Sequence, residues 1–366
     1  MAKLGKEWGN IARLRRELLA WYALNRRELP WRQTHDPYAI WVSEIMLQQT
    51  RVAVVMERYR AFLSQFPTVG SLAMAHVDEV LALWSGLGYY RRARMLHKAA
   101  QVVANERRGE MPLSAEELRV LPGIGSYTAA AIASIAYGEH AAVVDGNVER
   151  VLCRLEGWDG GGRVAEKRRI VSLAAELVDP AQPGDFNQAM MELGATVCLP
   201  RNPQCLVCPL NADCKTRGEH KTEPRARMVG REVGYALVVR RGRALSGGLV
   251  DDDDEVLLEQ RVAEQTVMPG LWELPTLREV NVPEEDLRMT VRHAIMQVNY
   301  TVRIRAMGEE AAELLTVAGG ERRWVAFSDA AGMGLTGLAR KVLSRAGLLR
   351  ISESEKISLR QLQEVV

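Results

Sequence analysis

A glycine-rich turn joins two segments that we expect to be helical, and it reads Leu121-Pro122-Gly123-Ile124-Gly125-Ser126-Tyr127-Thr128. A capping box at residues 114–117 predicts the start of the first helix. Because Gly123 and Gly125 carry no side chains, amides at the start of the second helix can approach a phosphate, and the helix dipole favours negative charge there. The turn predicts a helical hairpin that holds a DNA backbone through Leu121, Gly123, Gly125 and Ser126. The alternative is a plain tight turn between helices.

The chain around this turn has the periodicity of helices up to about residue 196. Apolar residues recur every three or four positions, as expected for one buried face per helix. The segments predicted to be helical are 11–24, 41–63, 77–84, 92–104, 126–137, 147–156, 165–178 and 186–196. We therefore expect residues 1–215 to form an all-α domain.

The pattern changes after residue 215. Residues 216–232 are polar and basic, which is typical of a linker. Beyond them, runs rich in Val, Leu and Tyr alternate with Gly, Pro and acidic turns, and they predict strands at 233–240, 255–261, 299–306 and 323–328. We expect a smaller α+β domain over 233–346 and a tail over 347–366. The acidic run at 251–255 is interpreted as a solvated hairpin loop, and metal binding is its weaker alternative.

Length and charge limit the class of protein. A chain of 366 residues, 47% hydrophobic and 26% charged, predicts two globular domains and excludes a disordered chain. The net charge of +2 divides into +5 for residues 1–230 and −3 for the rest, so any preference for a polyanion belongs to the first part. No apolar stretch is long enough to cross a bilayer, and a cytoplasmic protein that acts as a monomer is expected.

Four of the five cysteines are clustered with the spacing C-x6-C-x2-C-x5-C, at Cys198, Cys205, Cys208 and Cys214. Such clustering in a reducing compartment indicates a metal site, and four thiolates suit either zinc or a 4Fe-4S cluster. Zinc sites usually use two C-x2-C pairs and only one is present, so the spacing favours iron and sulfur. We expect Cys153 to be a buried structural thiol.

Two carboxylates stand out from their surroundings. Glu44 interrupts the apolar run at 41–47, where desolvation would raise its pKa as a general acid requires, although it could also be a solvated helix residue. Asp145, in the segment VVDGNVER at 143–150, directly precedes a predicted helix, where its usual role is that of a cap.

Taken in order, five segments resemble the MutY-type adenine DNA glycosylases of the endonuclease III superfamily. They are WVSEIMLQQT at 41–50, GLGYYRRAR at 86–94, LPGIGSYTA at 121–129, VDGNVER at 144–150 and the cysteine loop. The resemblance covers about residues 8 to 346. It implies a mainly α helix-hairpin-helix domain with an iron–sulfur loop at 198–214, followed by an α+β Nudix-like domain.

The resemblance also implies a reaction. Members of this family hydrolyse the N-glycosidic bond of an adenine that lies opposite 8-oxoguanine in double-stranded DNA, and some accept guanine opposite. Glu44 matches the acid that protonates adenine, and Asp145, with Asn147 beside it, matches the carboxylate that stabilises the sugar cation. Relatives that also nick the backbone carry lysine where this chain has Tyr127, so a monofunctional enzyme is expected.

Further positions match the family's contacts with DNA. Trp31, Arg32, Leu47 and Gln188 match the adenine pocket. Gln49 and Tyr89 match the side chains that fill the gap left when the base is flipped out. The resemblance assigns a 4Fe-4S cluster to the four cysteines, which makes Arg201 a candidate phosphate contact.

The segment VMPGLWELP at 267–275 resembles the Nudix-like module that inspects the oxidised guanine. The acidic pairs of a Nudix hydrolase are absent, which argues against a nucleotide pyrophosphatase. Where several relatives have a Phe-Ser-His turn, the aligned stretch here is Val291-Arg292-His293, and His293 is its candidate contact. Two other hypotheses stay open, namely a glycosylase for another base, such as mismatched thymine, and a DNA binder without activity.

Overall fold

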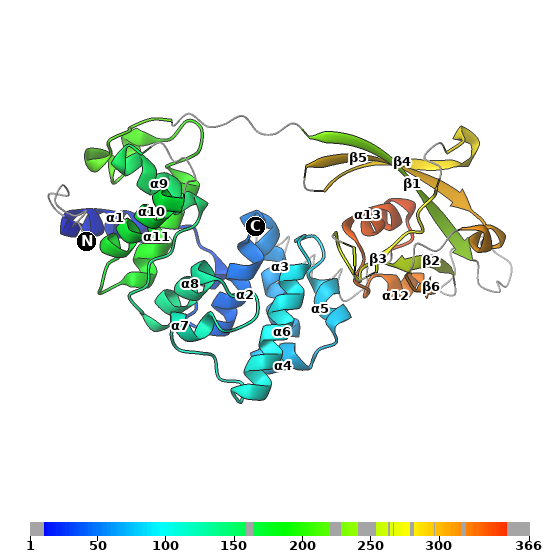
Figure 1. The fold of residues 1–366 in the computed structure, drawn as a ribbon, viewed down its shortest axis with the longest axis horizontal. Helices are drawn as coiled ribbons and strands as arrows, with labels where there is room; N and C mark the ends of the chain where they lie inside the picture. The colour runs from blue at the N-terminus through cyan, green and yellow to red at the C-terminus, as the bar shows by residue number, and fades with distance from the viewer. Residues whose placement is uncertain are drawn as a thin grey trace. The chain divides into compact units, whose positions relative to one another are not determined.

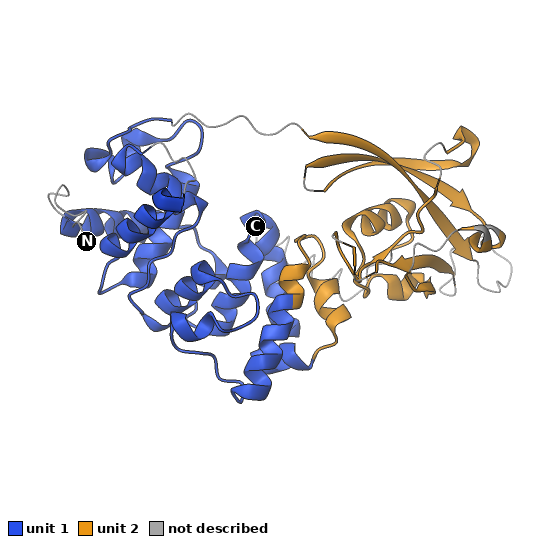
Figure 2. Cartoon of the chain, viewed as in Figure 1, with its two compact units in different colours: residues 1–74, 95–223 blue, residues 75–94, 224–366 orange. Residues whose placement is uncertain are grey.

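A computed structural model gives the fold, and its chain divides into two compact units (Figures 1 and 2). The first unit comprises residues 1–74 and 95–223, and the second comprises residues 75–94 and 224–366. The structure describes residues 11–158, 164–219, 228–240, 254–262, 264–265, 267–278, 282–295, 297–315 and 320–349.

The first unit is helical, as the periodicity predicts. Its elements are α1 (Ile11–Asn25), η2 (Pro30–Arg32), α2 (Pro37–Leu47), α3 (Val52–Gln65), α4 (Val69–Met74), most of α6 (Arg91–Glu106), α7 (Ala115–Leu118), α8 (Ser126–Tyr137), α9 (Gly146–Glu156), α10 (Val164–Leu177), α11 (Pro183–Thr196), η3 (Cys205–Val207) and η4 (Asn211–Asp213). The α5 helix (Val77–Leu83) belongs to the second unit.

The predicted helix over 41–63 is wrong in one respect, because the chain forms two helices there. Between α2 and α3, Gln49 has a left-handed backbone (φ 56°) and Arg51 is extended. Neither conformation continues an α-helix. The break leaves residues 48–51 as a connection, and Gln48, Gln49 and Thr50 in it border the cavity described below.

Helix ends in this unit follow from local chemistry. Asp36 caps α2 by accepting a hydrogen bond from the Tyr38 amide, and Pro37 provides the first helical residue. Gly138 ends α8 with a left-handed backbone. A side chain at Gly194 in α11 would stand 2.6 Å from the Cβ of Asn147, so only glycine lets α11 approach the start of α9 this closely.

The second unit contains a six-stranded sheet made of β1 (Val229–Arg240), β2 (Glu255–Gln260), β3 (Trp272–Glu273), β4 (Leu287–Ile295), β5 (Val298–Met307) and β6 (Arg322–Ala326). The order is β3-β2-β1-β5-β4, and β6 pairs with β2. Only β1 and β5 pair in parallel; the other described pairs are antiparallel. The helix α13 (Gly337–Ala346) packs Leu338 and Val342 against Val291 and Val302 of the sheet (Figure 1). The predicted helical and sheet-containing regions are confirmed.

Some details of the sheet were not predicted. The β4 strand was missed, and the strand expected over 323–328 ends at Ala326, where the short helix α12 (Phe327–Ala330) begins. Two acidic residues expected in a solvated loop are part of the fold: Asp254 is buried, and Glu255 opens β2 with an ion pair to Arg240. Residues 251–253, the middle of the expected linker (220–227) and the tail from 350 lie outside the described residues. The last part of the expected linker was predicted wrongly, because the chain from Val229 already belongs to β1.

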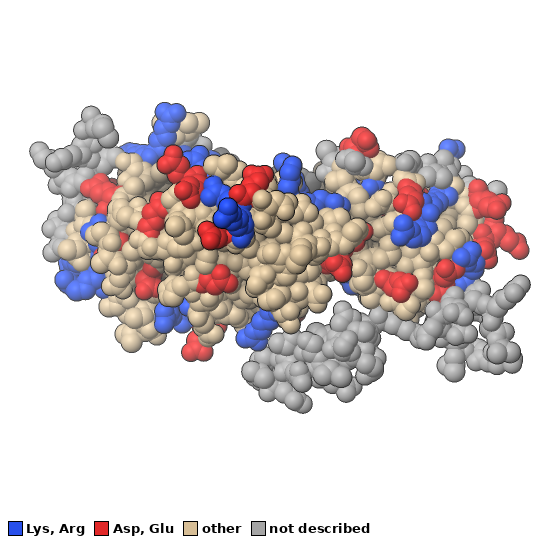
Figure 3. Space-filling view, turned by 90° about the horizontal axis from the view of Figure 1, so that it is seen from below, with Lys and Arg blue, Asp and Glu red and all other residues tan. Residues whose placement is uncertain are grey.

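Charges of both signs are interspersed on each unit over the face drawn in Figure 3. That face therefore carries no large field of a single sign, in keeping with the small net charge. None of the described helices combines the length and the apolar character needed to cross a bilayer.

Candidate active site

A cavity of about 600 Å³ opens in the first unit between α2, α8, α11 and the start of α9. It is large enough for a small ligand such as a nucleobase. The walls contain both candidate carboxylates, Glu44 and Asp145, together with Tyr127. Three parts of the chain that are remote in sequence thus bring their chemical groups to one space.

Glu44 lies on α2 with an exposed fraction of 5%. The pKa of its carboxyl is raised to about 7, chiefly by burial and also by the nearby charge of Asp145, while two contacts act in the opposite direction. The Tyr127 hydroxyl donates a hydrogen bond to Oε2 over 2.8 Å, and the Arg32 cation also favours the charged form. A carboxyl of this pKa carries its proton about half the time at neutral pH, which suits a general acid.

Asp145 is the N-cap of α9, as its position predicted. Its Oδ1 accepts a hydrogen bond of 2.7 Å from the Val148 amide, and its Oδ2 accepts one of 3.1 Å from the Asn147 side chain. These two donors fix the carboxylate at the cavity wall. Capping and a chemical role do not exclude each other here, because the same carboxylate does the first and borders the cavity.

Hydrogen bonds connect Asp145 to the start of the cysteine loop. Arg150 donates through Nη2 to the Asn147 side chain (2.9 Å) and to the Gly194 carbonyl (2.6 Å). Its Nε donates to the carbonyl of Cys198 over 2.8 Å. Asn147, which donates to Asp145, is therefore connected through Arg150 to the loop that carries the thiols.

The four residues predicted for the adenine pocket, Trp31, Arg32, Leu47 and Gln188, all border the same cavity, and so does Gln49. Trp31 is buried and packs edge-on against Tyr59, with ring centroids 5.4 Å apart. Sequence reasoning missed two charged residues of the wall, Arg27 and Glu192. The signal was present, because Glu192 interrupts an apolar stretch of α11 as Glu44 does in α2.

The glycine turn has the form predicted from its sequence. Gly123 is left-handed (φ 78°), and a Cβ there would stand 2.6 Å from the Met95 Cβ. Leu121 is buried, whereas Gly123, Gly125 and Ser126 are exposed. Gly125 caps α8 without any side-chain hydrogen bond. The first amides of α8 can therefore face an anion, one residue before Tyr127 of the cavity.

The remaining predicted contacts are not among the residues that line the cavity. Tyr89 belongs to the second unit, its side chain is 51% exposed, and its backbone is left-handed (φ 46°). The guanidinium carbon of Arg92 lies 5.7 Å from the centroid of the Tyr89 ring. Arg201 is exposed within the cysteine loop. The expectation of a turn at 291–293 is wrong, because these residues lie within β4, where His293 pairs with Tyr300. Burial and the charge of Lys341 lower the pKa of His293.

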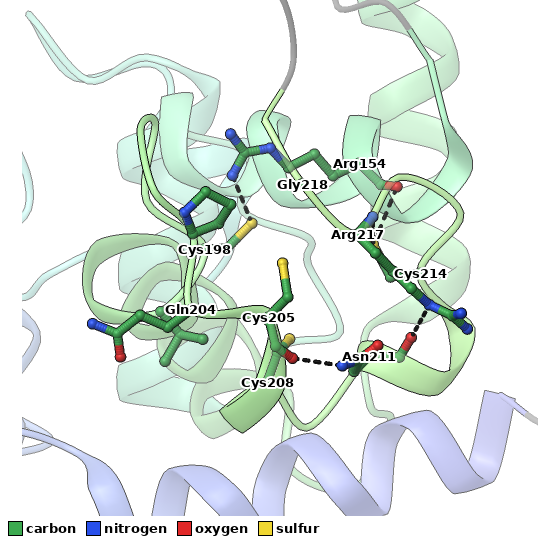
Figure 4. Close-up of a pocket in the computed structure, with 11 residues that line it drawn as sticks. Arg154, Cys198, Gln204, Cys205, Cys208, Asn211, Cys214, Arg217 and Gly218 are labelled. Atoms are coloured by element: carbon green, nitrogen blue, oxygen red, sulfur yellow. Dashed lines mark hydrogen bonds between the residues drawn. The ribbon is translucent and has the colours of Figure 1, made fainter.

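The four clustered cysteines line a second, small cavity of about 30 Å³, and Figure 4 shows Cys198 and Cys205 turned toward it. Arg154 is buried beside them; its Nη1 lies 3.3 Å from the sulfur of Cys198, and its carbonyl accepts a bond from the Cys214 thiol. Burial raises the pKa of Cys208 to about 11, and the three other thiols act in the same direction, which indicates that the sulfurs are neighbours.

All four clustered thiols belong to residues that line this one small cavity. Within the described residues, no three His, Cys, Asp or Glu side chains gather tightly enough for a single metal ion. By donor type and number, four thiolates fit either one tetrahedral zinc or an iron–sulfur cluster.

Comparison with known proteins places this geometry in a family. Residues 42–180 match the model of the HhH-GPD superfamily of base excision DNA repair proteins. The solved structure of a thermostable thymine-DNA glycosylase superposes with a TM-score of 0.52 at 31% sequence identity, over 56% of this chain and 94% of that one. The chain belongs to the HhH-GPD superfamily.

Curated relatives of this HhH-GPD protein include the adenine DNA glycosylase of Homo sapiens, 48% identical over 225 residues, which are 58% of this chain and 41% of the human protein. The adenine DNA glycosylase of Arabidopsis thaliana is 38% identical over 324 residues, 77% of this chain and 50% of the plant protein. The chain spans about half the length of these relatives. Glu44, Tyr127 and Asp145 all lie within the residues matched by the superfamily model.

Proposed function

We propose that this protein is a monofunctional DNA glycosylase that removes adenine lying opposite 8-oxoguanine, or opposite guanine, in double-stranded DNA. One observation carries the proposal: a buried carboxyl with a pKa of about 7 and a second carboxylate border the same cavity. The names of the curated relatives support adenine as the base. DNA would reach the cavity as a duplex with one nucleotide flipped out.

Glu44 would act as the general acid. Adenine leaves poorly as an anion, so the Glu44 proton passes to N7 of the base. As the bond between N9 and C1′ breaks, the electron pair of that bond moves onto the base. The Tyr127 hydroxyl holds Oε2 and so fixes which oxygen of the carboxyl is free to face the base. The Glu44 carboxylate left behind can then accept the proton of the incoming water.

Asp145 would stabilise the sugar. Loss of adenine leaves an oxocarbenium-like cation at C1′, and a fixed carboxylate lowers the energy of that charge in a partly desolvated cavity. Asn147 and the Val148 amide hold both oxygens of Asp145, so little reorganisation is needed when the cation forms. Water then adds to C1′ and leaves an abasic sugar.

Tyr127 supports the absence of a lyase step. A nick of the DNA backbone by this superfamily requires an amine that forms an imine with C1′, and a phenol cannot form one. Burial and the Glu44 charge raise the pKa of Tyr127 well above its ordinary value, so the phenol stays neutral and serves as a hydrogen-bond donor.

The four clustered cysteines would hold a 4Fe-4S cluster. Their all-thiol donor set and the cavity that they line support this assignment. When bound, the cluster would order the loop at 198–214 and hold Arg201 where a DNA phosphate could contact it. It would also fix the Cys198 carbonyl, which accepts the hydrogen bond of Arg150 behind Asp145.

The second unit would supply recognition of the lesion. Its sequence at 267–275 resembles a Nudix-like module, and the loop there is tightly formed, with a left-handed Met268 (φ 52°) and Gly270 (φ 72°). His293 is a weaker candidate for contact with 8-oxoguanine than the sequence suggested, because it is half-buried between β4 and α13.

A panel of duplexes tests the proposal. Single-turnover base release is measured with adenine opposite 8-oxoguanine, adenine opposite guanine and thymine opposite guanine, each with and without alkali. We expect adenine release in the first two, with strand breaks only after alkali. Release of thymine alone would instead favour the second candidate, a mismatch thymine glycosylase, which the similarity to the thermostable enzyme supports. Strand breaks without alkali would exclude monofunctional action.

A further inference from the structure

A third carboxylate borders the cavity, and neither the acid step nor the sugar step uses it. Glu192 lies on α11 and is completely buried. Arg27 donates to it three times, through its amide to Oε1 (3.0 Å), Nε to Oε1 (2.8 Å) and Nη2 to Oε2 (2.7 Å). Arg32 donates through Nη2 to Oε2 over 2.8 Å. One buried carboxylate thus binds two guanidinium groups.

The contacts keep Glu192 ionised. Burial alone would raise its pKa, but the hydrogen bonds from Arg27 and Arg32 outweigh burial and lower the pKa to about 2. A buried charge is tolerated only when it is paired and hydrogen-bonded, and here every described partner of the carboxylate is cationic or a backbone amide. The group of three side chains carries a net charge of +1.

The same contacts fix Arg32. Its Nη2 is held by Glu192, its Nη1 donates to the Arg27 carbonyl over 3.1 Å, and its guanidinium carbon lies 5.4 Å from the centroid of the Tyr22 ring. Arg32 is nearly buried, whereas the Arg27 side chain is 39% exposed. The guanidinium of Arg32 therefore has one orientation at the cavity wall, set by its contacts with Glu192 and the Arg27 carbonyl.

We propose that Glu192 is a positioning residue: with Arg27 it fixes Arg32 in the base pocket and offsets the Arg32 charge that acts on Glu44. This inference rests on the proposed role of Glu44 as the acid. Four charged or titratable groups face Glu44 or act on it from the surrounding elements, namely Tyr127 of α8, Asp145 before α9, Arg32 of η2 and, through Arg32, Glu192 of α11.

The sign of the effect follows from these charges. Arg32 lowers the pKa of Glu44, because a nearby cation favours the carboxylate. Removing the charge of Glu192 leaves two unbalanced cations and must lower the pKa of Glu44 further. Removing the charge of Arg27 leaves Glu192 with one partner and must raise it. A merely structural role for the group would produce neither shift.

Three variants test this prediction through the pH dependence of single-turnover adenine release. We expect Glu192→Gln to move the midpoint at which the rate falls to lower pH by about one unit, and Arg27→Gln to move it to higher pH. The double variant, Glu192→Gln with Arg27→Gln, restores the net charge of +1 and should return the midpoint toward that of the native protein. Glu259→Gln is the matched control, because Glu259 is a buried carboxylate paired with Arg322 in the second unit.

A second readout separates this inference from the proposed function. The Glu44 carboxyl is titrated by ¹³C nuclear magnetic resonance on the full chain, with its signal identified by its loss in Glu44→Gln. If the native protein releases no adenine, the proposed function fails, and this titration still measures the effect of Glu192. Midpoints that are equal in the native protein, Glu192→Gln and Arg27→Gln would overturn the inference. Because Arg27 is half-exposed, Arg27→Gln provides the test even if Glu192→Gln does not fold.

Discussion

Two glutamates of this protein look alike by every local measure and differ in what surrounds them. Glu44 in the first unit and Glu273 in the second both interrupt apolar runs, and their exposed fractions are 5% and 6%. Burial raises the pKa of each carboxyl to about 7. By burial and pKa alone, each would qualify as a general acid.

The difference lies in access and in the partner groups. Glu273 accepts hydrogen bonds from the Leu274 amide (3.0 Å) and from the Thr336 hydroxyl (2.6 Å), which itself caps α13. These contacts join β3 to α13, and Glu273 borders neither cavity described above. Glu44 borders the larger cavity opposite a second carboxylate. A raised pKa therefore identifies a buried carboxyl, and only the open space with Asp145 makes that carboxyl an acid for a substrate.

The largest expected difference concerns catalysis. We expect Glu44→Gln to reduce single-turnover adenine release by about 10³-fold, because general acids contribute roughly 10²- to 10⁴-fold. Glu273→Gln should change the rate by less than about threefold, since the hydrogen-bond partners of Glu273 only join β3 to α13. Equal losses in the two variants, with both proteins folded by circular dichroism, would contradict the comparison.

Asp145→Asn should reduce the same rate by roughly 10²-fold, because the amide cannot stabilise a cation as a carboxylate does. Asparagine is as good a helix cap as aspartate, so the free energy of unfolding should change by less than about 1 kcal/mol. A large loss of stability with a proportionate loss of activity would mean that Asp145 acts as a cap alone.

In stability, the two glutamates should behave alike. Each carboxyl has an ordinary pKa of 4.5 when unfolded and about 7 when folded, so the folded protein holds a proton that the unfolded chain releases. The stability due to each proton is complete below pH 4.5 and is lost as the pH rises through 7. Relative to the native protein, Glu44→Gln and Glu273→Gln should each gain about 3 kcal/mol between pH 4 and pH 8. Denaturant unfolding across that range measures the gain, and a flat difference would show that the carboxyl is not protonated.

The smallest effect concerns the Tyr127 hydroxyl, whose counterpart at Glu273 is the Thr336 hydroxyl. Its hydrogen bond lowers the pKa of Glu44. Tyr127→Phe should therefore raise the midpoint of the pH–rate profile, by about one unit if the bond contributes about 1.4 kcal/mol. A shift to lower pH would mean that the phenol does not stabilise the carboxylate form of Glu44.

The sequence predicted those parts of the site that local patterns encode. Glu44 and Asp145 were visible because each contrasts with its neighbours in the chain, and the structure brings them to one cavity. The contacts of Glu192 were not predictable, because its partners Arg27 and Arg32 lie 165 and 160 residues away. The break in the predicted helix over 41–63 depends on the left-handed backbone of Gln49, and no neighbouring glycine or proline indicates this break in the sequence.

Less of the second unit could be predicted from the sequence, for a related reason. Its segment 75–94 comes from the middle of the helical region of the sequence, and Tyr90 in it donates to the Leu335 carbonyl over 3.1 Å. Such a pairing depends on tertiary packing and leaves no periodicity in the chain. The strand placement of His293 likewise follows from pairing with β5, which a motif alignment does not contain.

The most direct test of this account is the pH dependence of single-turnover adenine release from a duplex with adenine opposite 8-oxoguanine. The account predicts a rate that is high at acidic pH and falls with a midpoint of about 7, the pKa of Glu44. Glu44→Gln should lose both the rate and this midpoint, whereas Glu273→Gln should keep them. A rate that stays constant through pH 7 in the native protein, or a midpoint that persists in Glu44→Gln, would contradict the assignment of Glu44 as the acid.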